Sequence, residues 1–125
     1  MRDPQAQKES AYRRLIAWQK ALDFCVAVYE LVKLLPQQEL YGLRSQLQRT
    51  AVSVPSNIAE GASRGSQKEF IQFLHVSLGS IAEVETQIEI AIRTQLLTKE
   101  HSQRALHLAI ETKQLVLALR RSLMR

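Results

Sequence analysis

Apolar residues recur at alternating intervals of three and four in four separate segments of the chain, and this spacing limits the fold more than any other feature. It places apolar side chains along one stripe of an α-helix. The clearest stripe runs through Phe70, Leu74, Ser77, Ile81, Val84, Ile88 and Ala91. No segment alternates as a β-strand does. The sequence therefore predicts an all-α protein.

Local signals limit the four predicted helices to about residues 10–35, 39–61, 66–94 and 98–123. Pro36 ends the first helix because it cannot donate the next backbone hydrogen bond, and Gly61 is a natural end for the second. Ser66 and Glu69 form a capping box before the third, and Thr98 suits the N-cap of the fourth. Because short connections join antiparallel neighbours, we expect one domain, residues 1–125, folded as an antiparallel up-down-up-down four-helix bundle.

Pro55 lies inside the second predicted helix and leaves the carbonyl of Ala51 without its usual donor. Two outcomes are open: the helix is kinked at Pro55 and continues to Glu60, or it breaks and restarts with Ser53 as a new N-cap. We favour the kinked helix.

Ser53, Asn57, Glu60 and Arg64 step by four, three and four, so they share one stripe of this helix. Glu60 precedes Arg64 in the order that favours a helical ion pair, and an asparagine can tie neighbouring helices together. We expect a structural polar network of Ser53, Asn57, Glu60 and Glu83 that fixes helix register. The alternative is a binding surface that uses Asn57, Arg64 and Lys68.

The third predicted helix is locally acidic and carries a glycine at its middle. Its acidic face is either solvated, with an ion pair between Glu89 and Arg93, or Glu83 reaches Arg44 or Arg49 on the second helix. Gly79 lowers helix propensity. We expect it to mark the close approach of another backbone.

Two helices have more apolar residues than a four-helix bundle of a single chain needs for its core. The first has a seam of Leu15, Trp18, Leu22, Cys25, Tyr29 and Val32, and beside it a second stripe of Phe24, Val28, Leu31 and Leu35. The fourth has a second stripe of Leu106, Ile110 and Leu117. We expect the extra stripes to meet other subunits. The alternative is a wide core face with scattered exposed leucines.

The composition limits the kinds of binding and catalytic site that the protein can form. The net charge of +5 permits binding to phosphate backbones. Cys25 is the single cysteine, so an intrachain disulfide is excluded, and we expect it to be a small buried hydrophobe. The three histidines lack metal-ligand spacing, and no P-loop is present. We expect a cytoplasmic protein without membrane span, metal, cofactor or small-molecule substrate.

Several runs of residues resemble one known family. The longest is Val54-Pro55-Ser56-Asn57-Ile58-Ala59-Glu60-Gly61, preceded by residues 46–53 and followed by Arg64. The others are Leu15-x-x-Trp18, Leu35-Pro36, residues 39–43, Lys68-Glu69-Phe70, Phe73-Leu74 and residues 79–83. Together they resemble the bacterial four-helix-bundle proteins called 23S rRNA intervening-sequence proteins; the C-terminal helix matches by pattern only.

The resemblance implies an antiparallel four-helix bundle that assembles as a ring-like homopentamer. The family is named for genes found inside inserts in large-subunit ribosomal RNA. Similar bundles are accessory subunits of diversity-generating retroelements, where a basic pentamer works beside a reverse transcriptase and its template RNA.

The leading functional hypothesis is a non-enzymatic, oligomeric RNA-binding protein that contacts phosphates. Its candidate binding residues are Arg13, Arg14, Arg44, Arg49, Arg64, Lys68, Arg120 and Arg121. Few aromatic residues are available for stacking on bases, so we do not expect sequence-specific reading. The alternative is an interaction subunit that recruits a reverse transcriptase or similar enzyme, or a purely structural module. Hydrolysis is disfavoured because Glu60 has no partner acid or activated nucleophile nearby in sequence.

Overall fold

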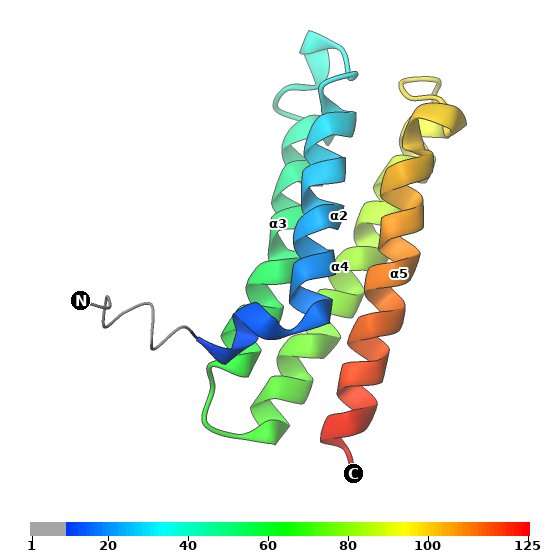
Figure 1. Ribbon diagram of the computed structural model, residues 1–125. Helices are drawn as coiled ribbons and strands as arrows, with labels where there is room; N and C mark the ends of the chain where they lie inside the picture. The colour runs from blue at the N-terminus through cyan, green and yellow to red at the C-terminus, as the bar shows by residue number, and fades with distance from the viewer. Residues whose placement is uncertain (1–9) are drawn as a thin grey trace, which may run out of the picture.

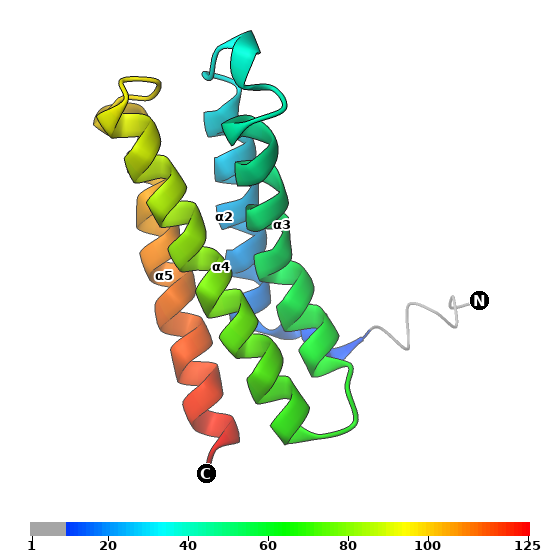
Figure 2. The same cartoon turned by 180° about the vertical axis from the view of Figure 1, so that it is seen from behind.

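The computed structural model describes residues 10–125, which form four long helices and no strand. A 3-10 helix, η1 (Ala11–Arg14), precedes α2 (Ile16–Val32), and a second, η2 (Gln37–Glu39), precedes α3 (Leu43–Ala62). The last two helices are α4 (Gln67–Arg93) and α5 (Lys99–Leu123). Consecutive long helices run in opposite directions (Figure 1). α2 packs against α3 and α5, and α4 packs against the same two helices (Figure 2). The prediction of an all-α four-helix bundle is confirmed.

The helix ends agree with the sequence where a side chain caps the backbone. The hydroxyls of Ser66 and Thr98 accept hydrogen bonds from the backbone N–H groups of Glu69 and His101, at 3.2 and 3.0 Å. The start of the first predicted helix was wrong, because η1 and an extended Leu15 precede α2. The second helix also begins later than predicted, because η2 and a turn occupy residues 37–42.

The core contains most of the predicted seam of α4, but α2 uses its other stripe. Phe24, Val28, Leu31 and Leu35 are buried, whereas Leu22 and Tyr29 are 38% and 39% exposed. The expectation that the Phe24 stripe would meet another subunit was therefore wrong. Periodicity alone cannot choose between adjacent apolar stripes. Ala17 and Ala21 continue the Phe24 stripe at the same spacing of three and four, and both are buried.

The α3 helix continues through Pro55, which is buried. The alternative of a break with Ser53 as a new N-cap is therefore wrong, while the kink stays a prediction. A buried hydroxyl of the neighbouring helix forms a hydrogen bond to this part of α3. Ser77 of α4 donates a hydrogen bond of 2.9 Å to the carbonyl of Val54. This bond fixes the two helices against each other beside the proline.

Two glycines have roles that differ from the sequence-based expectation. Gly61 does not end α3; it is buried within the last turn of the helix. A Cβ placed there would lie 2.7 Å from the Cβ of Phe73, so glycine is required by the close approach of α4. Gly79, by contrast, has open space where a Cβ would be. No backbone of the described chain approaches it.

Candidate nucleic-acid interface

Cations gather at one end of the bundle, from three segments that are far apart in sequence. The segments are η1, the connection between α3 and α4, and the last turn of α5, all at the lower end in Figure 1. They carry Arg13, Arg14, Arg64, Lys68, Arg120, Arg121 and Arg125. The described carboxylates in these segments and the adjoining helix turns are Glu60 and Glu69. We call this surface the basic end.

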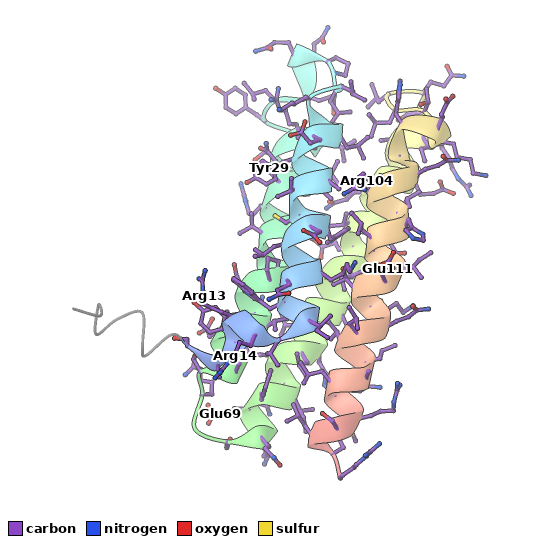
Figure 3. The ribbon with its side chains drawn as sticks, in the orientation of Figure 1. Arg13, Arg14, Tyr29, Glu69, Arg104 and Glu111 are labelled. Atoms are coloured by element: carbon purple, nitrogen blue, oxygen red, sulfur yellow. The ribbon has the colours of Figure 1, made fainter. Side chains whose placement is uncertain are left out.

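The arginines of η1 lie beside an aromatic pair. The rings of Tyr12 and Trp18 meet edge to face, with centroids 5.2 Å apart. The guanidinium of Arg13 lies over the Trp18 ring, 5.3 Å from its centroid. Arg13 and Arg14 are both exposed and lie on the same side of the basic end (Figure 3).

Arg64 is held in place by two neighbours. Its Nη2 lies 2.7 Å from Oε1 of Glu60, which confirms the predicted ion pair. Its guanidinium also lies 5.0 Å from the centroid of the Phe73 ring. Lys68 is exposed in the first turn of α4. Arg120 is half-buried, and its Nε is enclosed without a hydrogen-bond partner within the described chain.

Two of the predicted binding residues lie away from the basic end. Arg44 is in the first turn of α3, at the opposite end of the bundle. Arg49 lies one turn further on and donates a hydrogen bond of 3.3 Å to the Ser45 hydroxyl. Arg125 belongs to the basic end and was missing from the predicted set. Its place beside Arg120 and Arg121 near the chain end was the available signal.

Two members of the predicted polar network, Ser53 and Glu83, bond across the seam between α3 and α4, whereas Glu60 pairs with Arg64. The Ser53 hydroxyl meets that of Ser80, and Thr50 donates to the Glu83 carboxylate at 3.2 Å. Glu83 therefore binds Thr50 instead of Arg44 or Arg49. Asn57 donates to the carbonyl of Ser53 within its own helix. The serine and threonine pairs, not the asparagine, connect the two helices.

A second ionic cluster joins α2 to α5. Lys20 Nζ lies 3.1 Å from Glu111 Oε2, and His107 Nε2 lies 2.7 Å from Glu111 Oε1. The hydrogen bond from Lys20 holds the pKa of the Glu111 carboxyl below its ordinary value, and His107 acts in the same direction. Figure 3 shows Glu111 between the two helices. The contact between Lys20 and Glu111 joins residues that are far apart in sequence, so helical spacing did not reveal it.

The potentially reactive side chains of residues 10–125 are the single cysteine, the histidines and the carboxylates. No group of three His, Cys, Asp or Glu residues there is arranged to hold a metal ion. Cys25 is half-buried, and burial raises the pKa of its thiol, so the reactive thiolate is disfavoured. A cavity of about 310 Å³ lies between α2 and α5. Its lining combines apolar residues with the charged or titratable side chains of Asp23, Glu30, His101 and Arg104. None of the helices in this part of the chain combines the length and apolarity needed to cross a membrane.

Comparison with known proteins gives a consistent picture. A solved structure from Bacteroides thetaiotaomicron, described as a protein of unknown function from the S23 ribosomal protein family, is similar, with a TM-score of 0.76 and 28% sequence identity. The match covers 83% of this chain and 97% of that one. No curated protein matches the chain. The family model described as 23S rRNA-intervening sequence protein matches residues 13–118. The chain belongs to the 23S rRNA-intervening sequence protein family.

Proposed function

We propose that this protein is a non-enzymatic RNA-binding protein and that RNA binds at the basic end. The observation that carries the proposal is the gathering of seven cations from three segments at one end, with two carboxylates among them. Like charges on a folded surface repel one another, so such a cluster favours an anionic partner. Phosphate contacts of this kind supply affinity without reading sequence.

Membership of the family supports an RNA partner, since the family takes its name from inserts in ribosomal RNA. The chemistry of the described residues agrees with binding without catalysis. The Glu60 carboxylate, which is the acidic group nearest the basic residues of the α3–α4 connection, is engaged by Arg64. It is therefore not placed as an unpaired general base.

The test is a filter-binding titration with a structured RNA at low and moderate salt. The wild-type protein is compared with the double variant Arg120→Glu/Arg121→Glu and with the matched variant Arg44→Glu/Lys99→Glu, which makes the same charge change at the opposite end. We expect the first variant to lose roughly tenfold or more in affinity and about two units of salt slope. The matched variant should bind nearly as wild type. Absence of binding by the wild type at low salt would refute the proposal.

We also propose that several copies of the chain assemble, through two faces that the single chain leaves uncovered. On α4, Gly79 lies in open space between exposed Val76 and Ile90. On α2, Leu22, Val26 and Tyr29 form an exposed bulky stripe. A mid-helix glycine costs about 1 kcal/mol relative to alanine, and no contact within the described chain requires it. If the bulky α2 stripe of one copy packed against the Gly79 face of the next, the contact would cover both exposed faces and would explain the glycine.

Contact between two different faces is heterologous, and a heterologous contact closes into a ring when its rotation permits. The resemblance to relatives that form homopentamers supports this arrangement. Size-exclusion chromatography with light scattering measures the result directly. We expect a mass that is a multiple of the 14.3 kDa chain, five for a pentamer. A mass of one chain at micromolar concentration would refute assembly.

A further inference from the structure

The cations of the basic end come from different sides of the bundle and are not arranged in a single row. Arg13 and Arg14 lie on η1, which packs against α2 and α3. Arg64 and Lys68 lie on and beside the connection from α3 to α4, and the last turn of α5 carries Arg120 and Arg121. Packed helix axes are about 10 Å apart. The cations are therefore distributed around a surface about two helices wide, which suits a broad anionic surface better than a single thread of phosphates.

The described aromatic rings near the basic end already contact other side chains, and Phe70 packs against the hydrophobic core. Trp18 has Tyr12 at its edge and the Arg13 guanidinium over its face. Phe73 has the Arg64 guanidinium over its ring. The exposed Tyr29 and Tyr41 lie in the C-terminal half of α2 and after η2, away from this surface. Proteins that bind single strands stack bases on open aromatic faces, and this stacking supplies much of their affinity. The basic end lacks that source of affinity.

We propose that the basic end binds the backbone of double-stranded RNA in preference to a single strand; this inference rests on the RNA-binding function proposed above. A duplex carries the charge of two strands over the same length, so more phosphates face the three groups of cations at once. The A-form minor groove is wide and shallow and displays its backbone across a broad surface. A single strand presents one row of phosphates and must be ordered on binding.

The experiment measures the affinity of the full chain for two probes by fluorescence anisotropy at equal salt. One is an RNA hairpin with a stem of about 20 base pairs, and the other is an unstructured oligouridylate of about the same length. We expect the hairpin to bind at least roughly tenfold more tightly and with a steeper salt dependence. Arg14→Glu and Arg121→Glu, at two sides of the surface, should each weaken hairpin binding. Lys99→Glu at the other end should leave it unchanged.

The possible results distinguish failure of the duplex preference from failure of the proposed RNA-binding function. If neither RNA binds, the proposed function fails. If the single strand binds as tightly as the hairpin, RNA binding stands and the preference for duplex is wrong. Trp18 is the only tryptophan and reports stacking directly. Strong quenching of its fluorescence by the oligouridylate would show that bases reach the ring, and would also overturn the inference.

Discussion

At the scale of single residues, Gly61 is the glycine at which the fold has the least room for a side chain. A Cβ there would lie 2.7 Å from the Phe73 Cβ and 3.0 Å from a ring atom of Phe70. We expect Gly61→Ala to lower the free energy of unfolding by about 1–3 kcal/mol, because the last turn of α3 must move away from α4. Urea denaturation measures this change. Gly65→Ala is the matched control, since its Cβ would meet nothing within 4 Å and it should be neutral or slightly stabilising. Equal stability of the two variants would contradict this account.

At the scale of helices, the contact between Lys20 and Glu111 fixes α2 against α5 and makes stability depend on pH. A carboxyl whose pKa is lowered by folding stabilises the protein above its unfolded pKa. That stability is lost as the pH falls through the ordinary glutamate value of about 4.3 and below it. We expect Lys20→Met to flatten this acid-side loss, measured by urea unfolding at several pH values between neutral and acid. Lys33→Met is the control. It removes the same charge, but its partner Glu30 lies on the same helix and both side chains are exposed, so the pair does not join two helices. Parallel pH profiles for wild type and Lys20→Met would show that Lys20 does not lower the pKa.

At the scale of the whole molecule, the surface proposed for phosphate binding and the faces proposed for assembly are different. The basic end lies at the helix termini, whereas Gly79 and the exposed α2 stripe lie on the sides of the bundle. We therefore expect Gly79→Leu to fold, because its side chain has open space, but to reduce the mass measured by light scattering toward that of one chain. Ala118→Leu, an exposed change on α5, should leave the mass unchanged. An unchanged mass for Gly79→Leu would place the interface elsewhere.

The sequence by itself determined the fold class, the four helices and the capped starts of α4 and α5, because these depend on local spacing and on side chains within one turn. It also predicted the ion pairs Glu60–Arg64 and Glu89–Arg93, which join residues four apart on one helix. The run from residue 54 to residue 61 identified the family for the same local reason: it is contiguous in the chain.

Only the tertiary structure decided which surfaces of these helices meet. Two adjacent apolar stripes on α2 have similar spacing, and packing against α3 and α5 selected the one that contains Phe24. Within the single chain, packing also placed the close approach of a neighbouring helix at Gly61 and left Gly79 open, because the need for glycine depends on what lies opposite it. The basic end brings together residues more than a hundred positions apart, Arg13 and Arg121 among them. They share this end because α2 and α5 run in opposite directions (Figure 1), so the start of one and the end of the other lie at the same end of the bundle, which no local pattern contains.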